Sequence, residues 1–292
     1  MRLDRIKRSE NVDDRRGRGG GKKAAGGIGA IVMALIAIFV FKQDPVQELG
    51  KLAAEQSSGR QGAYTPTPEE EEMSKRVDQV LYLTEVVWGE IFPDTALHFT
   101  KRSSPYVEPT LVKFSGQVQS ACGHASAAMG PFYCPADQQV FIDLAFFKEM
   151  EVKMNAPGDF AQAYVVAHEV GHHVQKLLGF SEYVHRQRLK VSKAEYNELS
   201  VRLELQADYF AGVWARHAQE KEKILEEGDV EEGLRAAFAV GDDTIQKRAQ
   251  GYVVPEAFTH GSAEQRIRWF SLGLKTGDPT AHNPFDLPYE KL

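Results

Sequence analysis

A hydrolytic metal site is indicated by the stretch AHEVGHHVQ at residues 167–175. Within it, His168, Glu169 and His172 follow the pattern H-E-x-x-H. Residues four apart lie on one face of a helix, so both imidazoles can reach the same ion. Glu169 lies about 100° around the helix from His168, where its carboxylate can take a proton from metal-bound water without being a ligand. His173 lies off this face, and we predict that it is a partner or surface residue rather than a ligand.

A third ligand is expected downstream, because a hydrolytic zinc ion is held by three protein ligands and keeps one position for water. The stretch ELQADYF at residues 204–210 offers one. Glu204 and Asp208 are four apart and would share a helix face. We predict that Glu204 completes a site for one zinc ion per chain, and that Asp208 accepts the second ring N–H of a ligating histidine. The alternative is that both carboxylates belong to the solvated face of an amphipathic helix.

Peptide hydrolysis at such a site also needs a hydrogen-bond donor aimed at the negative charge that develops on the attacked oxygen. The loop FTHGS offers His260 as a candidate catalytic residue, and its alternative is a purely structural loop histidine. The segments FYC and VFID predict a hairpin whose edge strand could pair with an extended peptide, or serve only as part of the core.

The elements that must position these residues are mostly helices, so the predicted fold class is α+β and helix-dominated. Thr67 is a natural N-cap for a helix that begins at Pro68, and a small sheet is expected within residues 96–147. Apolar residues at helical spacing predict helices at 159–178 and 192–219. A further helix starts at Asp229 with Glu232 in a capping box, and a short one covers the sequence AEQRIRWFSLGL. Gly171 lowers helix propensity inside the zinc motif, so it needs a packing reason.

A membrane anchor is predicted at residues 24–41, which are 18 residues without a charge. Residues 1–23 hold nine basic and four acidic side chains, which leaves a net charge of −11 for the rest of a chain whose total is −6. The positive-inside rule places this basic tail in the cytoplasm and the C-terminal part across a bacterial inner membrane. The acidic body argues against nucleic-acid binding. A cleavable signal peptide is the alternative, but no small-x-small cleavage site follows.

The predicted organisation is therefore a tail at 1–23, an anchor at 24–41, a polar linker at 42–67 and one domain at 68–292. Cys122 and Cys134 are twelve residues apart in a segment rich in turn residues. An oxidising compartment would allow a disulfide between them, and two buried thiols are the alternative.

The combination of H-E-x-x-H with E-x-x-x-D resembles the gluzincin pattern of zinc metallopeptidases. More narrowly, the chain resembles the YpfJ-type neutral zinc metallopeptidases of bacteria. The matching stretches include SENVDDRRG, SACGHASAAMGPFYCPADQQVFIDLAFF, AHEVGHHVQ, ELQADYFAGVWA, GDDTIQKRAQG and VVPEAFTHGSAEQRIRWF. This resemblance implies a membrane-anchored, zinc-dependent peptidase. Family members carry cysteines at the positions of Tyr209 and His282, which implies a second bridge that this chain lacks.

Two functions remain as expectations. The first is a zinc peptidase, expected to be an endopeptidase, with Glu169 as the general base and a peptide or protein as substrate. The second is a catalytically idle, zinc-binding module that is tethered to the membrane and recruits a partner. Glu169 favours the first, because a purely structural zinc ion does not require a glutamate there.

Overall fold

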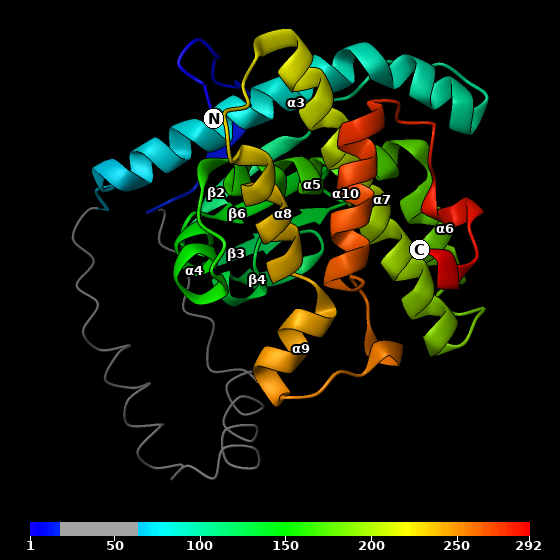
Figure 1. Cartoon of the computed structure of the whole chain (residues 1–292). Coiled ribbons are helices and arrows are strands. Elements are labelled where there is room, and N and C mark those ends of the chain that lie inside the picture. The colour runs from blue at the N-terminus through cyan, green and yellow to red at the C-terminus, as the bar shows by residue number, and fades with distance from the viewer. Residues whose placement is uncertain (18–63) are drawn as a thin grey trace, which may run out of the picture. The chain divides into compact units, whose positions relative to one another are not determined.

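The computed structural model describes residues 1–17 and 64–292 (Figure 1). The predicted anchor at 24–41 and most of the linker lie outside these residues. Within the described ranges, no helix combines the length and the apolar character needed to cross a bilayer. Residues Met1–Arg15 and Thr67–Leu292 form one compact unit.

The described part of the chain is helix-dominated with small sheets, as predicted. Its α-helices are α3 (Pro68–Thr100), α4 (Ala145–Met154), α5 (Asp159–Leu178), α6 (Phe180–Gln187), α7 (Lys193–Glu222), α8 (Asp229–Ala239), α9 (Asp242–Gln250) and α10 (Ala263–Thr276). Its strands are β1 (Val12–Asp14), β2 (Thr110–Phe114), β3 (Gln117–Ser120), β4 (Gly123–Ser126), β5 (Phe132–Cys134) and β6 (Gln139–Asp143).

The main sheet has the strand order β1-β2-β6-β5. β1 and β6 both pair with β2 in parallel, whereas β5 pairs with β6 in antiparallel register. The predicted hairpin of FYC with VFID is therefore confirmed, with Tyr133 opposite Val140, and β5 is an edge strand. β3 and β4 form a separate two-stranded sheet. The disulfide between Cys122 and Cys134 is also confirmed.

The first long helix begins where the sequence predicts. Thr67 caps it through the Glu70 backbone N–H, and the Glu70 side chain accepts a hydrogen bond from the Thr67 N–H, which makes a complete capping box. α3 continues through Pro93 to Thr100, so residues 96–100 are helical although we expected the sheet region to start there. The sheet itself begins only at Thr110.

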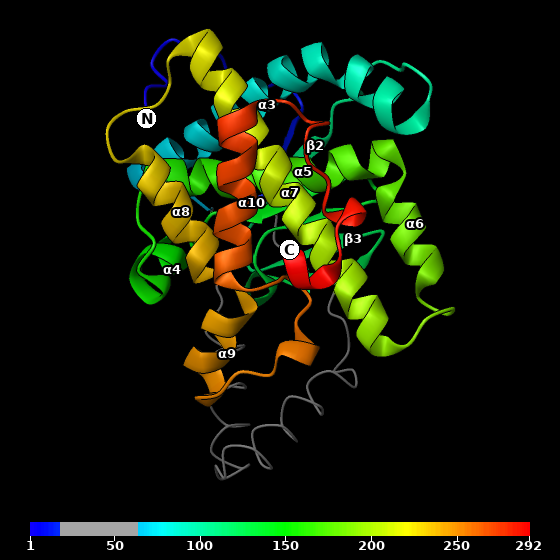
Figure 2. The same cartoon turned by 45° about the vertical axis from the view of Figure 1, so that its right-hand side comes forward.

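Three helices cross at close range around the predicted site: α7 packs against both α5 and α10 (Figure 2). A Cβ added to Gly171 of α5 would lie 2.9 Å from the Ala207 carbonyl oxygen of α7. On the other side of α7, a Cβ on Gly273 of α10 would collide with the Tyr209 backbone. Close packing therefore explains the glycine at position 171, because any side chain there would push α5 away from α7.

The start of α8 corrects one expectation. The helix begins at Asp229 as predicted, but its N-cap is Gly228 and it has no capping box. Glu232 instead accepts a hydrogen bond of 3.1 Å from the Phe160 backbone N–H, at the first turn of α5. Glu232 thus satisfies one of the free N–H groups of α5 rather than those of its own helix.

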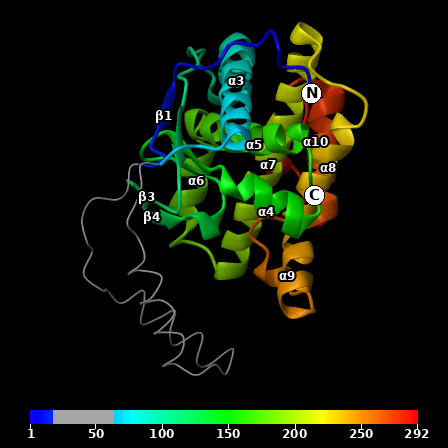
Figure 3. The ribbon, with the colours of Figure 1, turned by 90° about the vertical axis from the view of Figure 1, so that its left-hand side faces the viewer.

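Residues 1–15 differ from the separate basic tail that the sequence predicts, because they lie in the same compact unit as residues 67–292. Figure 3 shows this segment in blue, running from the N-terminus across α3 to β1. The amino group of Met1 lies 2.8 Å from an Asp159 carboxylate oxygen at the start of α5. Leu3 is buried in the main hydrophobic core.

Candidate metal centre

The predicted ligands converge on one point between α5 and α7. His168 Nε2 lies 3.2 Å from Glu204 Oε2, and His172 Nε2 lies 3.4 Å from Glu204 Oε1. The ligand atoms of all three residues lie within 4.8 Å of one another. Donor atoms around a tetrahedral zinc ion with bonds of about 2.0–2.1 Å are separated by about 3.3 Å. The spacing and the donor set, two imidazoles and a carboxylate, therefore fit a zinc ion.

Each of the two histidines predicted to be ligands is oriented by an acceptor on its other ring nitrogen. His168 Nδ1 lies 2.8 Å from Asp208 Oδ1, as predicted. His172 Nδ1 lies 2.9 Å from the Gln175 side-chain oxygen, which the sequence analysis did not anticipate. Because both partners accept, each Nδ1 carries a proton and each Nε2 faces the centre, where a metal ion would displace any proton that Nε2 carries. Gln175 is itself held, since its amide donates to the Leu203 carbonyl oxygen at 2.6 Å.

Asp208 is fixed by two further buried residues that the sequence reasoning missed. Arg266 of α10 pairs with both of its carboxylate oxygens, Nε to Oδ2 at 2.8 Å and Nη2 to Oδ1 at 3.0 Å. The Tyr164 hydroxyl donates to Asp208 Oδ1 at 2.5 Å. Arg266 is 3% exposed, and its position in a predicted amphipathic helix gave no sign that it points inward.

The charges in this cluster favour a cation at the ligand point. Burial alone would lower the pKa of His168, but the charge of Asp208 and hydrogen bonds to Asp208 and Glu204 raise it to about 9. Burial would raise the pKa of Glu204, yet the neighbouring charges of His172, His260 and His168 lower it. Arg266 likewise lowers the pKa of the buried Asp208. Both carboxylates are therefore held in the ionised form that metal binding and histidine orientation require.

Glu169 lies on α5 next to the ligands and is 8% exposed. Among residues 1–17 and 64–292, no group makes a hydrogen bond or ion pair with its carboxylate. The residue as a whole is buried, but its carboxylate oxygens are not fully enclosed, so water can reach them. The carboxylate is free to accept a proton from a water molecule at the centre.

His260 lies in the loop before α10 and is held by Asp242, the first residue of α9. Asp242 Oδ2 accepts the backbone N–H groups of Thr259 and His260, each at 2.6 Å. His260 Nδ1 lies 3.1 Å from Asp242 Oδ1. That hydrogen bond, followed by the negative charge of Glu204, raises the pKa of His260. The His260 ring therefore interacts electrostatically with a predicted metal ligand. The sequence predicts a role for His260, whereas Asp242 becomes apparent only in the fold.

His173 points away from the ligand point, as expected. Its Nε2 lies 2.6 Å from the Val107 carbonyl oxygen, and its Nδ1 lies 2.9 Å from the Tyr133 hydroxyl. The carbonyl can only accept, so Nε2 carries the proton and Nδ1 accepts from Tyr133. This fully buried histidine therefore joins α5 to the edge strand β5.

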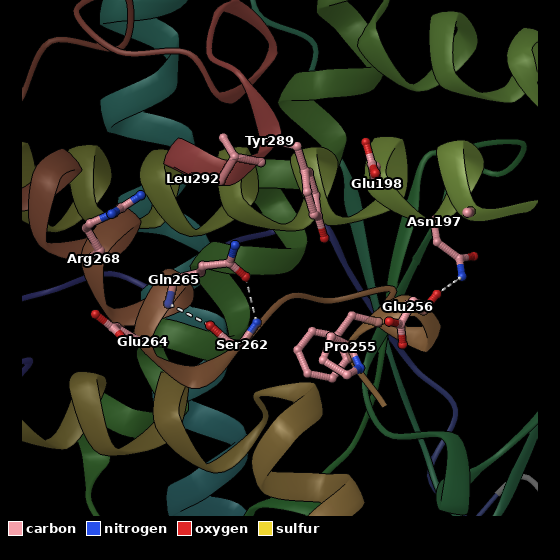
Figure 4. Close-up of a pocket in the computed structure, with 12 residues that line it drawn as sticks. Asn197, Glu198, Pro255, Glu256, Ser262, Glu264, Gln265, Arg268, Tyr289 and Leu292 are labelled. Carbon is pink, nitrogen blue, oxygen red and sulfur yellow. Dashed lines mark hydrogen bonds between the residues drawn. The ribbon is translucent and has the colours of Figure 1, made fainter. Parts of the chain in front are cut away.

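A cavity of about 420 Å³ lies beside the His260 loop (Figure 4). Phe258 and Ser262, on either side of His260 in the sequence, line it together with Asn197 and Glu198 of α7. None of the three predicted ligands lines this cavity. In the close-up, the Asn197 side chain donates to the Glu256 carbonyl oxygen, and this contact ties α7 to the loop.

Only one other group of residues in the described ranges could hold a metal ion by its spacing: Asp159, Asp229 and Glu232. These acidic groups already have partners. The Met1 amino group lies 2.8 Å from Asp159 and 3.3 Å from Asp229, and Glu232 accepts the Phe160 N–H. The centre at His168, His172 and Glu204 is therefore the better metal site.

The C-terminal tail remains attached to α7 without the second bridge of the family. The Tyr209 hydroxyl donates to the Asp278 carbonyl oxygen at 2.5 Å. The rings of Tyr209 and His282 meet edge to face with centroids 6.0 Å apart. Tyr209 and His282, the positions for which the resemblance implies a second bridge, are thus neighbours here, and their rings pack together.

Comparisons with known proteins agree with this geometry. The sequence model of a family described as "Putative neutral zinc metallopeptidase" matches residues 1–285. The chain is 44% identical over 292 residues to the uncharacterized protein YpfJ of Escherichia coli K12, covering 98% of this chain and 99% of that one. It is also 44% identical over 190 residues to the uncharacterized protein Rv2575 of Mycobacterium tuberculosis H37Rv, covering 62% and 63%. No solved structure matches the chain significantly. The chain belongs to the neutral zinc metallopeptidase family.

Proposed function

We propose that this protein is a zinc-dependent peptidase in which Glu169 is the general base. The observation that carries this proposal is the unpaired, water-accessible Glu169 carboxylate on the same helix as the two histidines that converge with Glu204. A zinc ion held by His168, His172 and Glu204 would lower the pKa of a bound water and polarise the scissile carbonyl. A site that only holds structural zinc has no use for such a carboxylate.

The residues of the chain divide the remaining work. Glu169 accepts the proton of the attacking water and passes it to the leaving amine. In its protonated form, which the hydrogen bond to Asp242 favours, His260 donates the Nε2–H to the negative charge that develops on the carbonyl oxygen. Asp242 keeps the His260 ring oriented, because it binds Nδ1 and the loop backbone at once. Nε2 is then the ring nitrogen left to face the substrate.

An extended peptide is the substrate conformation that the sheet favours. β5 is an edge strand, and Tyr133 on it contacts His173 on the metal-binding helix. A substrate strand added at this edge would gain main-chain hydrogen bonds close to α5. We further propose that the stretch 24–41 attaches the domain to a membrane, on the basis of its uncharged, apolar character and its basic flank, which anionic lipids attract.

The test compares the wild type with Glu169→Gln in the full-length protein, using zinc content and cleavage of a peptide library. We expect about one zinc per chain in both proteins. We expect the rate of cleavage to fall by about 10²–10⁴-fold in Glu169→Gln. Glu222→Gln, at the exposed end of α7, is the matched control and should cleave like the wild type.

Two results would contradict the proposal. If zinc-loaded wild type cleaves no peptide, the tethered binding module is the better description. If the folded wild type binds no zinc, both functions fail.

A further inference from the structure

Residues 1–15, here called the N-terminal segment, form an edge of the main sheet. Val12, Asp13 and Asp14 pair with Leu111, Val112 and Lys113 of β2. The ladder extends beyond the strand at both ends, because the Leu111 N–H donates to the Asn11 carbonyl at 2.9 Å and the Arg15 N–H to the Lys113 carbonyl at 2.8 Å. Without this segment, β2 would keep β6 on one side but lose its neighbour on the other side.

The segment also satisfies buried polar groups of α3. The Gln79 side-chain amide donates to the carbonyl oxygens of Leu3 and Ile6, both at 2.7 Å. The Glu85 carboxylate accepts from the Ser9 hydroxyl at 2.5 Å and the Asn11 amide at 3.0 Å. Gln79 and Glu85 are both buried, so they would be left without these partners if the segment moved away.

Charged groups extend the same contact. Lys113 is buried and pairs with Asp78 of α3 at 2.8 Å, while Asp14 of the segment lies 3.7 Å from the same ammonium. At the other end, the Arg2 N–H donates to the Ile224 carbonyl at 2.8 Å, and Arg2 Nε lies 3.0 Å from Glu226. The segment therefore contacts α3, β2 and the stretch that follows α7.

From these contacts we infer that the N-terminal segment is a structural part of the domain formed by residues 67–292, and that the two lie on the same side of any membrane to which the protein is attached. A single crossing between them would separate the two by a hydrocarbon layer about 30 Å thick. Hydrogen bonds of about 3 Å cannot form across that distance. The structure thus opposes the arrangement that the positive-inside rule predicts, with a cytoplasmic N-terminus and the domain on the other side. This inference does not depend on the proposed peptidase activity.

A crosslinking experiment tests the contact in the full-length protein within the membranes of expressing cells. Arg2 and Glu226 are substantially exposed, so Arg2→Cys with Glu226→Cys disturbs little. A short bismaleimide should link the two cysteines within one chain, detected as a linked peptide by mass spectrometry. The native cysteines are already bonded to each other and do not compete. Arg2→Cys with Leu189→Cys is the control pair, because Leu189 follows α6, which lies far from the N-terminus in Figures 1 and 2.

Two crosslinking outcomes overturn the inference. In the first, both cysteines of the Arg2–Glu226 pair react singly with maleimide, yet no link forms above the control. In the second, links form only between two chains, which would place the segment on a neighbouring molecule.

Sidedness is measured independently with a membrane-impermeant maleimide. Glu10→Cys reports on the segment and Leu189→Cys on the rest of the domain, because both positions are exposed. We expect both to be labelled in intact spheroplasts, or both only in inverted vesicles. Labelling of the two cysteines from opposite faces overturns the inference. Lys7→Cys, also exposed, repeats the measurement if Glu10→Cys fails to fold.

Discussion

Arg266 forms a bidentate ion pair with Asp208, with Nε 2.8 Å from Oδ2 and Nη2 3.0 Å from Oδ1. Asp208 in turn accepts from His168 Nδ1. The orientation of His168, the predicted metal ligand on α5, therefore depends on a residue of α10 through a carboxylate of α7. Bidentate pairing of this kind fixes the plane of the carboxylate as well as its position.

Replacing Arg266 should weaken zinc binding although Arg266 is not a ligand. Arg266→Met leaves the buried Asp208 charge without its main partner, and breaking such a pair costs about 3–5 kcal/mol of stability. The freed carboxylate no longer holds His168, so we expect zinc affinity to fall by about 10–100-fold. Chelator competition measures the affinity, and urea unfolding measures the stability. Arg235→Met, on the exposed side of α8, is the control; equal zinc affinity in both variants would contradict the positioning role.

Gln175 should matter for the second histidine in the same way. Gln175→Ala removes the acceptor of His172 Nδ1, and the ring is then free to rotate or change tautomer. We expect zinc affinity to fall by about 10–100-fold while the protein remains folded, as measured by zinc titration and circular dichroism. Gln250→Ala, at the exposed end of α9, should bind zinc like the wild type. The same result for Gln175→Ala would show that His172 needs no support.

Gly171→Ala should be destabilising although alanine is the better helix former. Its Cβ would lie 2.9 Å from the Ala207 carbonyl oxygen, so α5 and α7 must separate. Gly89 of α3 is the matched control, since nothing lies within 4 Å of its Cβ position. Gly89→Ala should raise the free energy of unfolding by about 0.5–1 kcal/mol, whereas Gly171→Ala should lower both this free energy and zinc affinity. Similar effects of the two substitutions would refute the close-approach argument.

Protonation of the buried His173 should lower the free energy of unfolding as the pH falls from 6.5 to about 4. Burial lowers the pKa of His173 from 6.5 to about 4, although the Val107 carbonyl opposes the shift. Between these two values the unfolded chain binds a proton at this residue and the folded protein does not. The free energy of unfolding therefore falls as pH falls through this window, by up to about 1.4 kcal/mol per pH unit from this residue.

Urea unfolding at several pH values between 7 and 4 measures the free energy of unfolding at each pH. The slope of this free energy against pH checks the prediction. His173→Gln should be less stable at pH 7, because it loses the contacts with Tyr133 and Val107, but its slope should be shallower. His124→Gln, at an exposed position, should keep the wild-type slope. Parallel slopes in all three proteins would assign the acid sensitivity to other groups.

Much of the metal centre could be predicted from the sequence because it depends on spacing within helices. The expected helix at 159–178 agrees with α5 at both ends, and the expected helix at 192–219 differs from α7 by a few residues. Once both helices are placed, the four-residue spacings put His168 with His172 and Glu204 with Asp208 on single faces.

The parts that the sequence could not predict depend on contacts between distant segments. Arg266 lies in a helix that was expected, but a buried arginine and a surface arginine have the same sequence pattern. Glu232 is placed correctly for a capping box, yet it caps α5, because α8 packs beside the start of that helix. β1 has three residues, two of them acidic, and its pairing with β2 spans almost a hundred positions. The β-propensities of its residues do not predict such a strand, because aspartate is rare in strands.

The glycine contacts on both sides of α7 have a consequence for how the centre tolerates change. Gly171 meets the Ala207 backbone on one side, and Gly273 meets the Tyr209 backbone on the other. The separation between the histidine pair and Glu204 is therefore set by main chain resting on main chain, which has no alternative rotamers. We therefore expect substitutions of side chains elsewhere in the core to change the distance between the two histidines and Glu204 less than substitutions of these glycines.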